Sequence, residues 1–259
     1  MTEQPSEIVH LDTTPDDDGI AIATITLDSQ HNRNAISRAL QRQLMVHLDA
    51  ADLDDSVRAV VIRADGPVFC SGADMVEAAS GSMEKGARRL VALQRKIVAL
   101  EKPVVARIHG PVRAGGLGIV AACDVAISAD TVSYAFTEVR LGLAPAVISL
   151  SVLPRLTDRA ASRYFLTGDT FDAHEAQRIG LVTKAVPADE LDAAVDAVVD
   201  SWRQGSSQGL RETKALLNQP LVRAIDEYGE HVVRQSARLF GSDDAIEAMS
   251  AFLDKRKPN

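Results

Sequence analysis

The spacing of hydrophobic residues predicts a β-hairpin followed by a helix at the start of the chain. Residues 8–12 and 19–27 are rich in β-branched residues, and an Asp- and Pro-rich segment separates them. Ser37, a favourable N-cap residue, comes next. Apolar residues then recur every three or four positions, on one face of a helix: Leu40, Leu44, Leu48 and Ala51. We therefore expect a hairpin and then a helix that ends near residue 52.

A unit of strand, glycine turn and helix occurs at least twice before residue 130. The apolar strand 57–63 is followed by the turn 69–74 (Phe-Cys-Ser-Gly-Ala-Asp), which leads into a helix-prone segment. The strand 104–108 leads in the same way into a glycine turn and a helix of small residues that begins near Gly115. A second apolar strand, 125–129, follows this helix. The recurrence predicts a mixed α/β core.

The remaining segments are predicted to be mostly helical. Small polar residues indicate a loop over 78–86, and helical spacing resumes over 87–100. Further helices are expected at 147–156, 159–166, 171–179, 189–203, 210–217, 220–240 and 242–255, with one strand-like segment at 181–186. The chain thus divides into an α/β core, residues 1–188, and a helical C-terminal region, residues 189–259, which we expect to pack on the core or on a neighbouring subunit.

Composition and charge narrow the class of protein. Hydrophobic residues make up 46% of the 259 residues and charged residues 25%, which is typical of a globular protein with a sizeable core. The net charge is −8, so no overall positive field attracts nucleic acid or an anionic membrane. The sequence has no apolar run long enough for a membrane span and no basic-then-apolar start, so we expect a cytoplasmic protein.

The two cysteines, Cys70 and Cys123, lie far apart and lack the spacing of metal ligands. We expect free thiols and no bound metal.

The glycine turn before residue 115 indicates a site for a carbonyl oxygen or an anion. Glycine lets the backbone approach a ligand closely, and the helix that begins there directs unpaired N–H groups and the positive end of its dipole into the same space. Such a site suits a carbonyl oxygen on which charge develops.

Three motifs together carry a family resemblance. They are Phe-Cys-Ser-Gly-Ala-Asp at 69–74, His-Gly-Pro-Val-Arg-Ala-Gly-Gly-Leu-Gly-Ile-Val-Ala-Ala-Cys-Asp at 109–124 and Glu-Val-Arg-Leu-Gly-Leu-Ala-Pro at 138–145. With this order and spacing the chain resembles the crotonase, or enoyl-CoA hydratase/isomerase, superfamily. The resemblance implies an α/β spiral of ββα units with a helical C-terminal trimerisation region. It also implies a homotrimer or a dimer of trimers that binds an acyl-CoA thioester, with coenzyme A as part of the substrate and no separate cofactor.

The resemblance also implies the catalytic groups. The backbone N–H groups of Ala73 and Gly115 are expected to hold the thioester oxygen. Of the family's two acid/base glutamates, one corresponds to Glu138, whose pKa we expect burial to raise. The other corresponds to Gly118, which has no side chain to transfer a proton. The stretch 146–150 (Ala-Val-Ile-Ser-Leu) also replaces the family's glycine-rich continuation, which predicts a different wall around the acyl chain.

Further residues are expected to bind the substrate, and several have a plain structural alternative. Asp74 is equally well explained as a helix N-cap, and His109 is better explained as a structural hydrogen-bonding group. Gly118 either permits close helix packing or opens room for a bulkier acyl group. The CoA phosphates have candidate partners in Arg33 and in the basic stretch 255–257. The full set of expected substrate-binding residues is Arg33, Asn34, Ala35, Ser71, Gly72, Asp74, Gly116, Gly118 and Pro145.

Three functions fit these residues. The first is hydration of a 2-enoyl-CoA, including a branched one such as methylglutaconyl-CoA, by a carbon–oxygen lyase. The second is Δ3,Δ2-enoyl-CoA isomerisation, for which one carboxylate suffices. The third is non-catalytic binding of acyl-CoA, against which Glu138 argues because a binding protein needs no carboxylate beside the acyl chain. We favour hydration, with isomerisation as the alternative.

Overall fold

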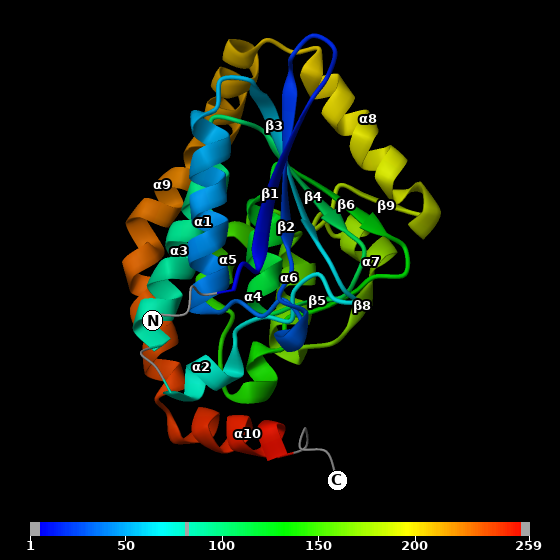
Figure 1. The fold of residues 1–259 in the computed structure, drawn as a ribbon. Helices are drawn as coiled ribbons and strands as arrows, with labels where there is room; N and C mark the ends of the chain where they lie inside the picture. The colour runs from blue at the N-terminus through cyan, green and yellow to red at the C-terminus, as the bar shows by residue number, and fades with distance from the viewer. Residues whose placement is uncertain (1–5, 81–82, 255–259) are drawn as a thin grey trace.

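A six-stranded sheet forms the centre of the molecule (Figure 1). The computed structural model describes residues 6–80 and 83–254. The strand order is β1-β2-β3-β4-β6-β9, in which β1 and β2 are antiparallel and all other neighbours are parallel. The bounds are β1 Val9–Pro15, β2 Ala21–Leu27, β3 Val57–Ala64, β4 Val104–Ile108, β6 Val125–Ala129 and β9 Lys184–Val186. The predicted hairpin and α/β core are confirmed.

A second, smaller sheet contains the short strand of each recurring unit. Its order is β5-β7-β8, with bounds β5 Val112–Arg113, β7 Ser133–Ala135 and β8 Phe171–Asp172. The chain passes from β4 through β5 to helix α4 (Gly115–Ala122), and then from β6 through β7 to helix α5 (Ala146–Val152). Strand, short strand and helix therefore recur, as the expected ββα units require.

Helices cover both faces of the large sheet. Helix α1 (Arg38–Leu53) packs on β1, β2 and β3, and α3 (Met83–Ala99) lies between α1 and α9 (Ser207–Phe240). Helix α8 (Leu191–Arg203) packs on β3, β4 and β6, on the other side of the sheet in Figure 1. The Ser37 side chain accepts a hydrogen bond from the Leu40 N–H at 3.1 Å, so the predicted N-cap of α1 is confirmed.

The remaining helices include the one at the C-terminal end of the described chain. Helix α10 (Asp243–Asp254) contacts the 3-10 helix η2 (Glu138–Leu141), and α10 lies below α2 in Figure 1. The remaining bounds are α2 Met75–Ser80, α6 Asp158–Thr167, α7 Ala173–Arg178, η1 Gln30–Asn32 and η3 Ala188–Glu190.

Three expectations about secondary structure need correction. The predicted loop 78–86 is largely helical, because α2 extends to Ser80 and α3 begins at Met83, while residues 81–82 lie outside the described residues. The segment 171–179 begins with strand β8 rather than with a helix. The separate helices 210–217 and 220–240 are one helix, α9, with Pro220 in its interior. Packing along α3 and α5 holds α9 together despite the N–H that proline lacks.

A buried ion pair attaches α9 to the core. The Lys214 Nζ lies 2.7 Å from the Asp124 Oδ2 and donates to the carbonyl oxygens of Ile97 and Lys102 at 3.0 and 2.9 Å. The Asp124 carboxylate also accepts from the Asn218 Nδ2 at 2.9 Å. Burial lowers the pKa of Lys214, and the Asp124 charge opposes this effect. Each charged group is therefore fully hydrogen-bonded, as a buried ion pair must be.

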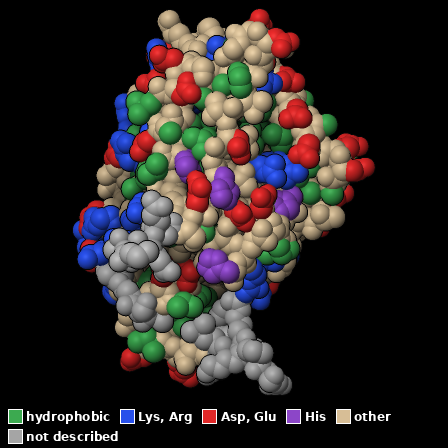
Figure 2. Space-filling model, in the orientation of Figure 1, with side chains coloured by type: hydrophobic (Ala, Val, Ile, Leu, Met, Phe, Trp, Pro, Cys, Tyr) green, Lys and Arg blue, Asp and Glu red, His purple; other side chains and the backbone are tan. Residues whose placement is uncertain are grey.

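The surface matches the mixed composition. On the face drawn in Figure 2, acidic and basic side chains are interspersed, with histidines near the centre. Among the helices of the described residues, none combines the length and the apolar character that crossing a bilayer requires.

Candidate active site

Three parallel segments bring the expected catalytic groups to one end of the small sheet. Cys70 forms a parallel bridge with Val112 of β5, and Val112 pairs in parallel with Tyr134 of β7. Ala73 lies three residues beyond Cys70, Gly115 three beyond Val112, and Glu138 four beyond Tyr134. Because parallel segments end at the same edge, the chain leaves the sheet in the same direction toward Ala73, Gly115 and Glu138.

The turns that precede Ala73 and Gly115 pack tightly against each other. Gly72 has φ +93°, and a Cβ on it would lie 2.9 Å from the Ala114 Cβ and 3.2 Å from the Arg113 carbonyl oxygen, so this position requires glycine. Ala114 has φ 46° and ψ −121°, a strained conformation for a residue with a side chain. Its N–H donates to the Ala135 carbonyl at 3.1 Å. The close approach of Gly72 to Ala114 fixes the positions of Ala73 and Gly115.

The N–H groups of Ala73 and Gly115 have no acceptor among the described residues. A Cβ built on Gly115 would lie 3.9 Å from the Ala73 nitrogen, so the two residues are neighbours. Gly115 is also the first residue of α4, where the helix dipole favours negative charge. Two unpaired donors at one place form an arrangement that can stabilise an oxyanion.

Glu138 presents a buried carboxylate with an unpaired oxygen. Its Oε2 has no hydrogen-bond partner within the described residues, and burial raises its pKa from 4.5 to about 7. The neighbouring Arg140 donates instead to the Thr167 carbonyl at 3.3 Å and to Asp169 at 3.2 Å. At neutral pH such a carboxyl group exists in both protonation states, which suits an acid/base catalyst.

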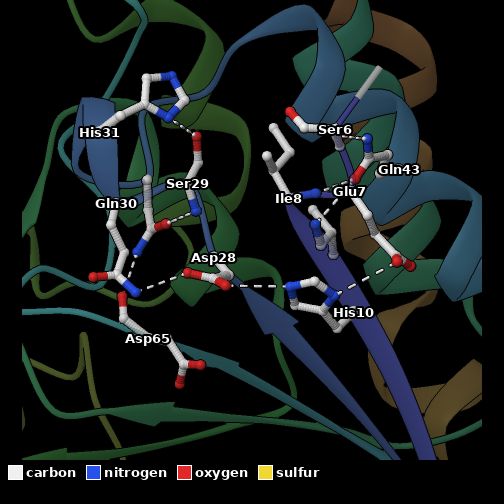
Figure 3. Close-up of polar contacts among 12 residues, drawn as sticks. Ser6, Glu7, Ile8, His10, Asp28, Ser29, Gln30, His31, Gln43 and Asp65 are labelled. Atoms are coloured by element: carbon white, nitrogen blue, oxygen red, sulfur yellow. Dashed lines mark hydrogen bonds and ion pairs between the residues drawn. The ribbon is translucent and has the colours of Figure 1, made fainter. Parts of the chain in front are cut away.

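Polar side chains anchor the loop that precedes the expected substrate-binding residues (Figure 3). Asp28 accepts from Gln30 at 2.9 Å and contacts the His10 ring at 3.3 Å. Gln43 of α1 accepts from the N–H groups of Ile8 and Val9 at 2.8 and 3.0 Å, which ties β1 to the helix. The loop is therefore held on both sides before it reaches Arg33.

The structure gives the loop residues 33–35 different tasks. The side chain of Asn34 is buried, accepts from the Ser29 N–H at 2.7 Å and donates to the carbonyls of Asp65 and Val68 at 3.0 and 2.8 Å. All of its polar atoms are therefore used within the protein. Ala35 is buried, while Arg33 is exposed beside it. Both Arg33 and Asn34 have positive φ, 59° and 53°. The other candidate for the CoA phosphates, the stretch 255–257, lies outside the described residues.

The expected residues around Ala73 are joined by hydrogen bonds to the loop 32–36. The Ser71 N–H donates to the Arg33 carbonyl at 3.1 Å, and the Gly72 carbonyl accepts from the Ile36 N–H at 2.8 Å. Asp74 accepts from the N–H groups of residues 76 and 77 at 3.0 and 3.2 Å, so its cap role is observed. Its second carboxylate oxygen accepts from Asn32 at 3.0 Å. Loop 32–36 and turn 71–74 are thus one hydrogen-bonded unit.

Two of the expected glycines serve packing. A Cβ on Gly116 would lie 2.8 Å from the Cys70 Cβ, so Gly116 lets α4 pack on that turn. A Cβ on Gly118 would lie 2.6 Å from the Ile148 Cγ2 and 3.2 Å from the Gln94 Oε1. The expectation that Gly118 opens room for a bulkier acyl group is therefore wrong, because Ile148 of α5 fills that space. Pro145 is buried at the N-cap position of α5.

Other polar residues near the turn have structural partners. His109 donates from Nε2 to the Gly66 carbonyl at 2.7 Å, which confirms its structural role, and Arg113 donates to Ser133. Both cysteines are unpaired and buried, and burial raises the pKa of each thiol to about 12, so neither thiol ionises readily. No group of three His, Cys, Asp or Glu side chains in residues 6–80 and 83–254 could hold a metal ion.

Sequence reasoning missed two residues that shape the site. Ala114 was not singled out, although a non-glycine residue inside a glycine turn is a signal that could have been noticed. In the sequence, Ile148 is only one residue of the stretch 146–150 that replaces the family's glycine-rich continuation. Its contact with Gly118 depends on how α5 packs on α4, which no local pattern reveals.

We expect Ala114→Gly to stabilise the fold by about 1 kcal/mol, because glycine adopts positive φ without strain. Urea denaturation measures the free energy of unfolding. The matched control is Ala121→Gly inside α4, the helix that follows Ala114, where glycine should instead cost about 1 kcal/mol or more. A loss of stability in Ala114→Gly equal to that of the control would show that the backbone at Ala114 is not strained.

Comparisons with known proteins point to one family. A family model described as enoyl-CoA hydratase/isomerase matches residues 17–259. A crystal structure of an enoyl-CoA hydratase from Mycobacterium avium is 47% identical, with a TM-score of 0.87, and the match covers 96% of this chain and 98% of that chain. A probable enoyl-CoA hydratase of Mycobacterium leprae is 31% identical over 239 residues, 92% of this chain and 93% of that protein. An enoyl-CoA isomerase/hydratase of Mycosarcoma maydis is 31% identical over 252 residues, 90% of each chain.

Proposed function

The chain belongs to the enoyl-CoA hydratase/isomerase family, and on that premise we propose that it adds water to the double bond of a 2-enoyl-CoA. The observation that carries the proposal is the buried, unpaired Oε2 of Glu138 beyond the same sheet edge as the unpaired N–H groups of Ala73 and Gly115. The hydratases among the similar proteins support this choice.

The two N–H groups would bind the thioester oxygen. When the oxygen of a deprotonating water molecule bonds to C3, negative charge moves through C2 onto the thioester oxygen, and an enolate forms. Preorganised donors stabilise such charge by about 3–4 kcal/mol for one hydrogen bond. Because both donors are backbone amides, their protonation does not change over the ordinary pH range.

Glu138 would carry both proton transfers. Its carboxylate takes a proton from water as the water oxygen bonds to C3, and the resulting carboxylic acid returns a proton to C2 of the enolate. The product is a 3-hydroxyacyl-CoA, and Glu138 ends in its starting state. A pKa of about 7 suits this cycle, since the group must accept and release a proton at the same pH.

A second candidate is Δ3,Δ2-enoyl-CoA isomerisation, and one observation favours it. The space beside Gly118 is filled by Ile148, so Glu138 has no second acid opposite it there. In this reaction Glu138 removes a proton from C2 of a 3-enoyl-CoA, the N–H groups hold the dienolate, and Glu138 returns the proton to C4.

A substrate panel separates the candidates. The purified protein is mixed with crotonyl-CoA, 3-methylglutaconyl-CoA and 3-hexenoyl-CoA, and the absorbance of the conjugated enoyl thioester is followed. Hydration predicts loss of absorbance with at least one of the first two. A gain with 3-hexenoyl-CoA alone would replace hydration by isomerisation, and binding without any turnover would leave an acyl-CoA-binding protein.

The assembly and location of the enzyme belong to the same proposal. We expect a homotrimer or a dimer of trimers in the cytoplasm, acting on an acyl-CoA without a further cofactor. Sedimentation equilibrium measures the assembly directly.

A further inference from the structure

Backbone strain in this protein is concentrated around the two unpaired N–H groups. Within the described stretches of the chain, three residues other than glycine have positive φ, namely Arg33, Asn34 and Ala114. The first two lie in the loop that is hydrogen-bonded to the turn of Ala73, and the third directly precedes Gly115. Such conformations are unfavourable and persist only where the surrounding structure holds them, so their gathering at one site indicates a function there.

Ala114 is the strained residue whose side chain meets the opposite turn. A Cβ built on Gly72 would lie 2.9 Å from the Ala114 Cβ, so the Ala114 methyl group fills the notch that the absent side chain of Gly72 leaves. Main-chain hydrogen bonds hold Ala114 in this place. Its N–H donates to the Ala135 carbonyl at 3.1 Å, and its carbonyl accepts from the Leu117 N–H at 2.9 Å. The strained backbone is therefore held from both sides.

The methyl contact joins the two peptide groups that carry the donors. The N–H of Ala73 belongs to the peptide bond that follows Gly72, and the N–H of Gly115 belongs to the peptide bond that follows Ala114. Because each peptide group is planar, the torsion angle ψ of the preceding residue sets the direction of the N–H. At Ala114 ψ is −121°, and a change to the helical value of about −42° would rotate the Gly115 N–H by roughly 80°.

We propose that Ala114 is a positioning residue, whose methyl group, seated in the notch at Gly72, fixes the spacing and direction of the two N–H donors. Both donors then point at one oxygen atom, as the proposed binding of a thioester oxygen requires. Strain that lowers the stability of the fold is retained here because preorganised donors are needed. This inference rests on the proposed function and adds a residue whose effect passes through the donors.

Ala114→Gly tests this role, because it removes the methyl group and relieves the strain at the same time. The full-length protein binds butyryl-CoA labelled with ¹³C at the thioester carbonyl, and infrared difference spectra record the stretching frequency of that carbonyl. A hydrogen bond weakens the C=O bond and lowers this frequency, so we expect a higher frequency in the variant than in the wild type.

Turnover should change in the same variant. With crotonyl-CoA we expect kcat to fall at least about tenfold, since the loss of one oxyanion donor costs about 10²–10³-fold. The Kd of butyryl-CoA should change much less, because the donors act most strongly on the charge that develops during the reaction.

Ala121→Gly is the matched control, since it makes the same exchange at the other end of α4. We expect the control to lower Tm and to leave the carbonyl frequency unchanged, whereas Ala114→Gly should raise Tm and change the frequency. Loss of turnover together with a gain of stability cannot result from unfolding. An unchanged frequency in Ala114→Gly, or an equal change in both variants, would overturn the inference.

The spectra also separate this inference from the proposed function. If the wild type lowers the carbonyl frequency but turns over neither substrate class, hydration and isomerisation fail, and the frequency in Ala114→Gly still decides the role of Ala114. If the wild type does not bind butyryl-CoA, or does not lower the frequency relative to the free thioester, the two donors do not hold the oxygen and the inference is overturned.

Discussion

Glu138→Gln is expected to abolish turnover while leaving acyl-CoA binding intact. Glutamine keeps the shape of the side chain and cannot carry a proton, so the loss in kcat should be at least about 10²–10⁴-fold. The thioester oxygen would still meet the unpaired N–H groups of Ala73 and Gly115, which the substitution does not touch. Calorimetric titration with a saturated acyl-CoA measures the binding. Turnover that survives the substitution would remove Glu138 from the mechanism.

The same substitution should stabilise the protein at alkaline pH. Burial raises the pKa of Glu138 from 4.5 to about 7, so between these values the folded protein keeps a proton that the unfolded chain has released. The stability that this proton contributes is present below pH 4.5 and is lost as the pH rises through 7. Glutamine has no such dependence, so the variant should gain up to about 3 kcal/mol over the wild type at pH 8 relative to pH 4.

Urea denaturation at the two pH values measures this difference. The matched control is Glu175→Gln, because hydrogen bonds from Arg178 and Tyr164 lower the pKa of Glu175. Its carboxylate is favourable in the folded protein at pH 8, so its replacement should reduce stability there. A gain of stability in the control equal to that of Glu138→Gln would attribute the effect to net charge and not to burial.

The second large effect is expected at Lys214. In Lys214→Met the largely buried Asp124 carboxylate, 19% exposed, loses its counter-charge, and the carbonyls of Ile97 and Lys102 lose their donor. Removing one partner of a buried ion pair costs about 3–5 kcal/mol. The free energy of unfolding in urea measures the loss. Adding Asp124→Asn should recover part of it, because the unpaired charge is then gone.

An exposed ion pair that also involves α9 provides the control. Arg95 of α3 and Asp226 of α9 are joined at 2.5 and 3.0 Å, and their side chains are 47% and 50% exposed. Arg95→Met should cost no more than about 1 kcal/mol, since water screens such a pair. Similar losses at Lys214 and Arg95 would show that burial does not set the energy of the Lys214 pair.

Local signals predicted the hairpin, the helix after Ser37 and the strand–turn–helix units. Each depends on residues that are close in sequence: the β-branched stretch 19–27, the cap at Ser37 and the glycine turn before Gly115. The family motifs then identified Glu138, whose Oε2 is buried and whose pKa is raised by burial, as expected. Its catalytic role remains a prediction.

The remaining features depend on tertiary packing. Pro220 predicts a break, yet α9 continues through it because the helix is packed along α3 and α5 and anchored nearby by Asn218, whose amide donates to the Val98 carbonyl at 3.0 Å. The sequence predicts open space beside Gly118 because glycine has no side chain, and no local pattern shows which residue packs against it. Ile148, thirty residues later, fills it.

The placement of Ala73, Gly115 and Glu138 just beyond the edge of the small sheet has a consequence for how this site can evolve. Two of the three groups belong to the main chain, so they persist under most single substitutions and are inherited with the turn itself. Of the three proposed groups, only Glu138 acts through its side chain, so one codon change there would exchange the proposed acid/base group while the two backbone donors stay in place. On the proposed mechanism, a lineage with this architecture can therefore change its reaction stepwise, without first losing the donors proposed to hold the thioester.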